Sequence, residues 1–231
     1  MKEDGEMPRC IQCMTPLKEV IHVYNIFKPP SQFCERCEQL WNNITITNHE
    51  DRCSKCLNIK TSNSNVCLDC QFLEKEFKLM DQLYCQYRYQ GIMKDTLQQY
   101  KFMRDYELSN VLSQKLQLPQ TDYDLIVPIP SPFERDAERT YNPVVTVLDK
   151  MGVDYVNVLG TNIRPKQSEL GKLERANASN PFYVKEVDID LEDKVILLID
   201  DIYTTGLTIH HAGCKLLSLN VRKFKVFEFA R

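Results

Sequence analysis

The sequence has no long apolar run, no leader-like start and no excess of positive charge. No stretch of about 18 apolar residues occurs, so we expect no membrane insertion. The opening MKEDGEMPRC is polar and acidic, unlike a secretory signal, and a cytoplasmic location is expected. The net charge of −3 gives no general attraction to nucleic acid. Any contact with nucleic acid must therefore come from a local patch.

Heptad repeats and low-complexity tracts are also absent, whereas cysteine is abundant and unevenly placed. Eight of the 10 cysteines form four Cys-x-x-Cys pairs in the first third of the chain. In a reducing compartment this pattern favours metal binding over disulfides. The two-residue gap lets both thiolates of a pair reach one tetrahedral zinc ion, at Zn–S distances of about 2.3 Å. The predicted ligands are Cys10, Cys13, Cys34, Cys37, Cys53, Cys56, Cys67 and Cys70.

Four pairs are enough for two sites of four thiolates, so we predict one or two structural Zn²⁺ ions. Sequential pairing is the simplest arrangement, with the first two pairs on one ion and the last two on another, but a crossed pairing is also open. Residues 1–80 show little periodic apolar pattern. They are expected to form a four-cysteine-type zinc-binding module whose folding depends on the metal. Residues 81–231 are expected to form a second domain.

Strand and helix patterns alternate in this second domain. Asn142 is expected to cap a helix that begins at Pro143 and ends before Gly152. The alternation predicts an α/β fold with a mainly parallel sheet flanked by helices. The expected strands are 83–90, 123–130, 155–160, 194–200 and 223–230, and the expected helices are 92–118, 143–151 and 207–219.

The stretch VILLIDDIYTTGLT, residues 195–208, carries the clearest functional signal. A buried strand leads to two carboxylates, a short Thr/Gly turn and a helix, whose N-terminus attracts phosphate. The carboxylates would repel phosphate and are better suited to accept hydrogen bonds from sugar hydroxyls. A plain strand-to-helix turn is the alternative. The predicted phosphosugar site comprises Asp200, Asp201, Thr204, Thr205, Gly206, Leu207 and Thr208.

This stretch resembles the motif by which type I phosphoribosyltransferases bind 5-phosphoribosyl-1-pyrophosphate (PRPP). The segments VPIPSPFERDAERTYN and QSELGKLERANASNPF, the cysteine pairs and a Tyr-Arg-Tyr-x-Gly step resemble the ComF (ComFC) family of competence-associated proteins. The resemblance covers nearly the whole chain. It implies a type I phosphoribosyltransferase-like domain that binds PRPP or a related phosphosugar, with Mg²⁺ arriving with PRPP.

The resemblance also implies roles for individual residues. Asp200 and Asp201 would meet the ribose hydroxyls, and the turn from Thr204 to Thr208 would hold the 5-phosphate. Thr204 stands where purine-salvage enzymes carry an acidic base, so no catalytic residue is assigned and enzyme activity is left open. Segment 164–175 would be the flexible loop over the site, with a solvated surface loop as the alternative. The basic residues expected at the pyrophosphate and on the flexible loop are Arg135, Arg139, Arg164, Lys166, Lys172 and Arg175.

The family implies assistance in handling incoming single-stranded DNA during natural transformation, with a ComFA-like DNA translocase or helicase as a partner. Two rival functions are an active phosphoribosyltransferase on an unknown acceptor and a zinc-module adaptor with a vestigial pocket. Residues 84–106 form a local basic segment, in which nucleic-acid bases could stack on Tyr87, Tyr89 and Tyr100. An amphipathic helix with buried tyrosines is the alternative. The nucleic-acid candidates are Arg88, Lys94, Lys101 and Arg104.

Overall fold

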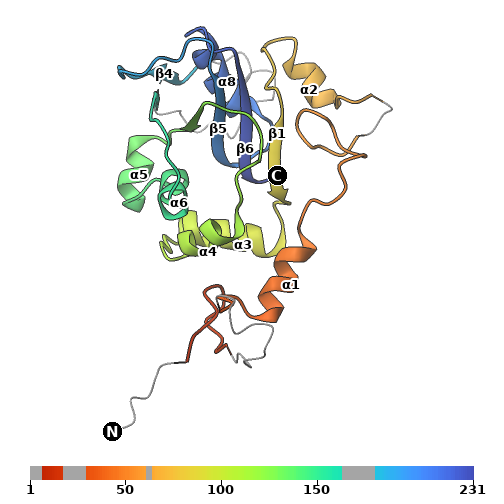
Figure 1. The fold of residues 1–231 in the computed structure, drawn as a ribbon, viewed down its shortest axis with the longest axis vertical. Helices are drawn as coiled ribbons and strands as arrows, with labels where there is room; N and C mark the ends of the chain where they lie inside the picture. Colours follow the sequence, from red (N-terminus) through yellow and green to blue (C-terminus); the bar gives the residue numbers. More distant parts are fainter. Residues whose placement is uncertain (1–6, 18–29, 61–63, 163–179) are drawn as a thin grey trace.

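A parallel sheet forms the centre of the protein in the computed structural model, which describes residues 7–17, 30–60, 64–162 and 180–231 (Figure 1). The strands are β1 (Leu83–Tyr87), β2 (Leu125–Pro128), β3 (Leu159–Thr161), β4 (Phe182–Val184), β5 (Val195–Ile202) and β6 (Lys223–Ala230). The parallel sheet has the order β1-β6-β5-β2, and β3 and β4 pair antiparallel outside it. The predicted α/β class with a mainly parallel sheet is confirmed.

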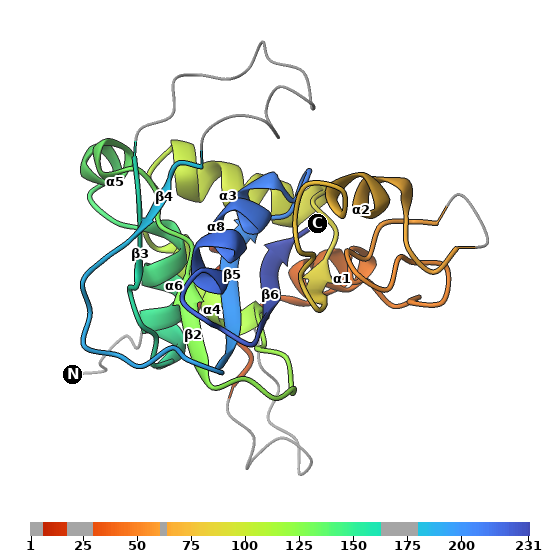
Figure 2. The same ribbon diagram turned by 90° about the horizontal axis from the view of Figure 1, so that it is seen from above.

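Helices and the cysteine-rich segment cover the two faces of this sheet (Figure 2). The helices are α1 (Glu35–Asn43), α2 (Leu68–Leu73), α3 (Gly91–Phe102), α4 (Leu108–Lys115), α5 (Phe133–Arg139), α6 (Pro143–Met151) and α8 (Leu207–Leu217). One core joins α3, α4 and α6 to sheet residues such as Phe227. The other joins α8 to sheet residues such as Val226 and to the cysteine-rich segment. In the described ranges, no helix is long and apolar enough to cross a membrane.

The helix α6 has the ends that the sequence predicts. The Asn142 side chain accepts hydrogen bonds from Val144 N and Val145 N, and Gly152 ends the helix with a φ of 65°. Three other expectations need correction. The expected helix 92–118 is two helices, separated by a turn in which Arg104 has a φ of 60°. The expected strand 155–160 is ordered as a strand only from Leu159, and α5 was not expected.

The cysteine-rich part is built as two copies of one small unit. Each begins with an Arg-Cys-x-x-Cys turn, and the residue after the second cysteine has a positive φ, 60° at Met14 and 59° at Leu57. In each turn the arginine closes the loop. Arg9 Nη1 donates to Met14 O at 3.2 Å, and Arg52 Nη1 donates to Leu57 O at 2.9 Å. The sequence predicts repeated cysteine pairs, and within the described residues the structure also repeats the arginine contact that closes each turn.

The second cysteine pair of each unit lies at the start of a helix. Cys34 is the N-cap of α1 and Cys67 is the N-cap of α2. Both units also pack into the cores of the sheet. Cys10 and Trp41 belong to the core on the α3 side, and the second unit belongs to the core on the α8 side. A domain boundary near residue 80 stays a prediction.

We predict that Gly213→Ala destabilises the protein, although alanine is the better helix former by about 1 kcal/mol. A Cβ at position 213 would lie 2.4 Å from an atom of the Phe224 ring on β6, and overpacking of a core costs about 1–3 kcal/mol. The free energy of unfolding, measured in urea, should fall. The double variant with Phe224→Leu should recover part of the loss, and a more stable single variant would contradict the prediction.

Candidate functional site

A cavity of ≈ 220 Å³ lies where β2 and β5 end, at the carboxyl edge of the parallel sheet. Ligands of open α/β sheets bind at this edge. The lining combines carboxylates from β5, basic side chains from α3 and α5, and the start of α6. The residues are Lys101, Ile129, Ser131, Arg135, Arg139, Asn142, Pro143, Val144, Asp200, Asp201, Ile202 and Thr208. The structure therefore brings together two sets of residues predicted separately, the carboxylates and the basic turn.

The turn between β5 and α8 has the form required of an anion site. Gly206 adopts a φ of 77° and is the N-cap of α8, with no side chain capping the helix. The first amides of α8 therefore have no capping side chain, as a phosphate site requires. Thr204 and Thr208 are exposed and Thr205 is half-buried, so their hydroxyls can reach a ligand.

The two carboxylates at the end of β5 differ in their surroundings. Asp201 Oδ2 lies 2.5 Å from Lys101 Nζ, and both side chains are mostly buried, at 15% and 17% exposure. Asp200 Oδ1 accepts a hydrogen bond from Asp201 N at 2.9 Å. Burial and the neighbouring Asp201 charge raise the pKa of Asp200 to about 7. A ligand that offers hydroxyl donors would favour the charged form of Asp200.

Lys101 was predicted only as a nucleic-acid contact, and its ion pair with Asp201 was missed. The two residues are separated by 100 positions, and no local pattern links the end of α3 to the end of β5. Arg139 supports the same lysine, because its Nε donates to Lys101 O at 3.0 Å. Lys101 thus neutralises part of the carboxylate charge inside the cavity.

Glu228 is a buried acidic residue beside the site that sequence reasoning also missed. It is 0% exposed and lies opposite Asp200 in the β5–β6 register. Within the described part of the chain, neither carboxylate oxygen has a hydrogen-bond partner. Burial, followed by the charges of Asp200 and Asp201, raises the pKa of Glu228 well above its usual value. The polar residues within KFKVFEFA give no sign of this burial, but both faces of β6 are covered, by one core at Phe224 and Val226 and by the other at Phe227 and Phe229.

The basic turn after β2 is held rigidly at the cavity. The amide of Asn142 donates to Ser131 Oγ and Asp136 Oδ2, both at 3.0 Å, while its oxygen caps α6. The predicted pyrophosphate residues Arg135 and Arg139 both line the cavity. The other predicted basic residues, Arg164, Lys166, Lys172 and Arg175, lie outside the described residues.

The nucleic-acid candidates are dispersed rather than grouped. Lys94 and Arg104 are exposed on or after α3, while Arg88 is half-buried and donates to Asn43 O. Two of the tyrosines expected to stack on bases are in the core, because Tyr87 is 9% exposed and Tyr100 is 0% exposed. For these two residues the alternative of buried tyrosines is correct. The exposed apolar side chains of this region are Phe102, Met103 and Tyr106.

The cysteines form two groups of four, in which the sulfur atoms lie within 4.8 Å of one another. Four thiolates on one zinc ion, with Zn–S bonds of about 2.3 Å, stand about 3.8 Å apart. The Sγ–Sγ distances of 3.6 Å for Cys13–Cys34, 3.5 Å for Cys56–Cys67 and 3.8 Å for Cys53–Cys70 fit this geometry. The sequential pairing is confirmed, and each group suits one structural zinc ion. The groups are Cys10, Cys13, Cys34 and Cys37, and Cys53, Cys56, Cys67 and Cys70.

Comparison with known proteins gives the family. The chain is 31% identical over 231 residues to Competence protein ComFC of Streptococcus pneumoniae, covering 96% of this chain and 100% of that protein. The chain belongs to the ComFC family of competence proteins. It is 28% identical over 218 residues to Competence protein ComFC of Bacillus subtilis, covering 90% of this chain and 88% of that protein. No protein-family model matches the chain.

Among solved structures, this ComFC-family chain matches a hypoxanthine phosphoribosyltransferase from Staphylococcus aureus. The identity is 15%, the TM-score is 0.28, and the match covers 68% of this chain and 69% of that one. At this level the match carries no inference about substrate or activity. The fold rests instead on the parallel sheet and its helices.

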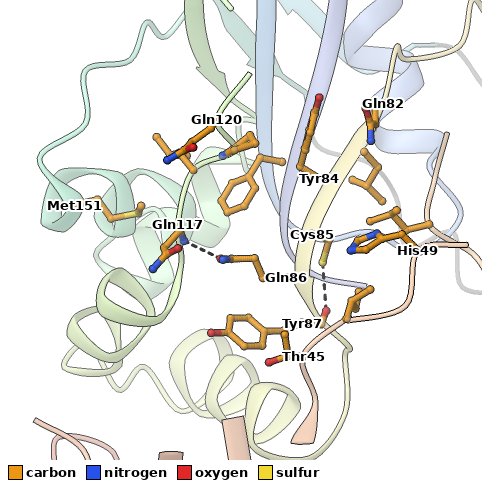
Figure 3. Close-up of a pocket in the computed structure, with 16 residues that line it drawn as sticks. Thr45, His49, Gln82, Tyr84, Cys85, Gln86, Tyr87, Gln117, Gln120 and Met151 are labelled. Carbon is orange, nitrogen blue, oxygen red and sulfur yellow. Dashed lines mark hydrogen bonds between the residues drawn. The ribbon is translucent and has the colours of Figure 1, made fainter. Parts of the chain in front are cut away.

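A larger cavity of ≈ 800 Å³ lies elsewhere in the ComFC-family chain, along the outer edge of β1 (Figure 3). Its lining has no Lys, Arg, Asp or Glu and includes His49, Tyr84, Cys85 and the amides of Gln82 and Gln86. Figure 3 shows Gln86 directed toward Gln117, and the backbone N–H of Gln117 donates to Gln86 Oε1 at 2.8 Å. A pyrophosphate requires cationic partners, so the smaller cavity, which is lined by Lys101, Arg135 and Arg139, is the better candidate for such a ligand.

We predict that Glu228→Gln makes stability less dependent on pH. The folded pKa of Glu228 lies above its usual 4.5, so the unfolded chain loses this proton first. The wild-type protein therefore loses stability as the pH rises from about 4.5 toward the folded pKa, by up to about 1.4 kcal/mol per pH unit. Glutamine has no proton to lose.

Urea unfolding at pH 5 and pH 8 tests this prediction. Asp200 acts in the same direction below pH 7 in both proteins, because its pKa is also raised. The difference between wild type and Glu228→Gln therefore reports on Glu228 together with its electrostatic coupling to Asp200. Equal losses of stability in the two proteins between pH 5 and pH 8 would show that Glu228 is not kept protonated in the folded state.

Proposed function

We propose that this ComFC-family protein binds PRPP, or a closely related phosphosugar, in the cavity at Asp200, and assists the uptake or processing of single-stranded DNA during natural transformation. The observation that carries the proposal is the division of this cavity. Carboxylates occupy one part, arginines occupy another, and the uncapped start of α8 adjoins them at Thr208. PRPP has the matching groups, namely a ribose diol, a 5-phosphate and a pyrophosphate.

Each chemical group of PRPP finds a partner of suitable charge. The ribose diol would donate hydrogen bonds to Asp200 and Asp201, and the 5-phosphate would sit on the amides that begin α8. Arg135 and Arg139 would hold the pyrophosphate. Mg²⁺ would be held mainly by pyrophosphate oxygens and water. The Lys101–Asp201 pair reduces the repulsion between the carboxylates and the incoming anion.

Calorimetric titration of PRPP with Mg²⁺ into the zinc-loaded protein tests the binding site. Asp201→Asn should weaken binding by about 10- to 100-fold, because hydrogen bonds to a charged group contribute about 1.5–3 kcal/mol. Arg139→Ala should weaken the binding of PRPP more than that of ribose 5-phosphate, because the arginine is assigned to the pyrophosphate.

The control is Asp154→Asn, an exposed carboxylate outside the cavity, which should bind PRPP like the wild type. Equal binding by wild type and Asp201→Asn would remove the carboxylates from the site. No binding of PRPP by the wild-type protein would contradict the proposed ligand altogether.

The nucleic-acid part of the proposal concerns the exposed surface at the end of α3. Arg104 supplies charge there, and Phe102 and Met103 are 72% and 75% exposed. Lys94 is exposed near the start of the same helix. Exposed apolar side chains next to cations suit single-stranded DNA, in which bases stack on aromatic rings. This surface adjoins the cavity, because Lys101 on the same helix lines it.

We predict that Phe102→Ala combined with Arg104→Glu weakens binding of a single-stranded oligonucleotide by at least about 10-fold, since one stacked base contributes about 1–3 kcal/mol. Fluorescence anisotropy at fixed salt measures the affinity. Phe133→Ala is the control, because Phe133 is 80% exposed on α5 rather than on α3. Unchanged affinity in the double variant would show that this surface does not bind DNA.

A further inference from the structure

The second cysteine group lies directly behind the turn that is assigned to the phosphate. All four of its cysteines are buried, whereas Cys13 of the first group is exposed. The core that contains the second group also contains Tyr203 and Ile209, from the turn and from α8. Because protein cores are close-packed, a change in the packing of the second group must also shift the residues of the turn.

Arg231 links a ligand of this group to the turn. Its Nη2 donates to Cys56 Sγ at 3.4 Å, and its Nε donates to Cys56 O. The same guanidinium lies over the ring of Tyr203, 5.0 Å from the centroid. One side chain thus contacts both a cysteine ligand and the residue three positions before Gly206.

The side chains of Tyr203 and of Leu73 on α2 both lie against Gly206. A Cβ at position 206 would lie 2.2 Å from Tyr203 Oη and 3.3 Å from Leu73 Cδ1, so the glycine backbone rests against both side chains. Leu73 belongs to α2, the helix that begins at the ligand Cys67 and includes the ligand Cys70. The element that presents two of the four thiolates therefore also supports the turn.

A second contact joins the same segment to the first turns of α8. Phe77 packs against the rings of His210 and His211, with centroid distances of 5.8 Å and 5.1 Å. Burial lowers the pKa of His210 to about 4, so the ring is neutral, and its Nδ1 lies 2.7 Å from Gly206 O. Since a carbonyl only accepts, Nδ1 is the donor. The ring of Phe77 and the hydrogen bond from His210 to Gly206 thus fix the position of the start of α8.

The first cysteine group has different neighbours. It lies in the core on the α3 side, where Gln12 Nε2 donates to Thr96 Oγ1 at 3.2 Å. Glu38 of α1 pairs with Lys115 of α4, with 2.7 Å between Oε2 and Nζ. These contacts support the opposite face of the sheet from α8. The two groups share one internal design but support different parts of the fold.

We propose that metal binding at the second cysteine group sets the conformation of the turn 203–206, so that zinc at this group and phosphosugar at the turn bind cooperatively. Zinc at the first group lacks this effect. The proposal rests on the proposed function for the identity of the ligand. Because linkage is reciprocal, PRPP must in turn strengthen zinc binding at the second group only.

The paired variants Cys53→Ser and Cys10→Ser test the proposal in the full-length chain. Both cysteines are 0% exposed and occupy the same position in their units, so both variants should lose one of two zinc equivalents. Titration with PRPP and Mg²⁺ should show binding at least 10-fold weaker for Cys53→Ser and within threefold of wild type for Cys10→Ser. Equal affinities in the two variants would overturn the proposal.

Arg231→Met provides a milder test that leaves all eight thiolates in place. It should weaken PRPP binding and speed the release of one zinc equivalent to a chelator, measured by the colour of the chelator complex. Added PRPP should slow that release in the wild type. Arg222→Met is the control, because Arg222 pairs only loosely with Asp193, at 3.8 Å on the surface. Identical zinc release by Arg231→Met and wild type would contradict the link.

Hydrogen exchange separates this inference from the proposed function. Loss of zinc from the second group, in Cys53→Ser, should speed amide exchange in residues 203–208, while Cys10→Ser should leave it unchanged. This measurement needs no ligand. Suppose the wild type fails to bind PRPP, but amide exchange at the turn still depends on zinc at the second group. The proposed ligand is then wrong, and the coupling between the second group and the turn is correct. If PRPP binds and neither variant affects the turn, the link is wrong.

Discussion

The pairing of β5 between β2 and β6 is the constraint on which the site depends. It places an apolar strand at the centre of the sheet and brings Asp200 and Asp201 to its carboxyl edge. The same register sets Glu228 beside Asp200, where desolvation raises the pKa of Glu228. Lys101 pairs with Asp201 inside the cavity. A raised pKa on one carboxyl group and an ion pair on another both reduce the repulsion within this cluster of carboxylates.

The two cysteine units relieve a shortage of core in the first third of the chain. Each unit is too small to bury a core of its own, and a metal held by its four thiolates would replace the missing apolar contacts. Their placement is not equivalent, however. The first unit braces the α3 side of the sheet, and the second lies behind the turn between β5 and α8. The two similar units thus support different parts of the fold, because each packs against different elements.

Several predictions from the sequence were correct because they rest on local chemistry. The cap of α6 by Asn142, the strand–carboxylate–turn–helix order at residues 195–208 and the sequential grouping of the cysteines each depend on residues close together in the chain. The helix 92–118 was wrong because a single residue of positive φ, Arg104, divides it without a glycine or proline to mark the break. For Tyr87 and Tyr100 the structure bears out the alternative of buried tyrosines rather than a stacking platform, a choice that the sequence pattern left open.

By itself, the sequence determined the α/β class, the grouping of the cysteines into two sets of four and the strand–carboxylate–turn–helix order at residues 195–208, since each follows from residue type and short spacing. The tertiary structure alone decided that Lys101 pairs with Asp201, that Glu228 is buried with a raised pKa, and that Arg231 contacts both Cys56 and Tyr203. The reason is physical. These contacts join residues from separate elements, and their energies depend on desolvation and packing that exist only once the sheet and its covering layers have formed.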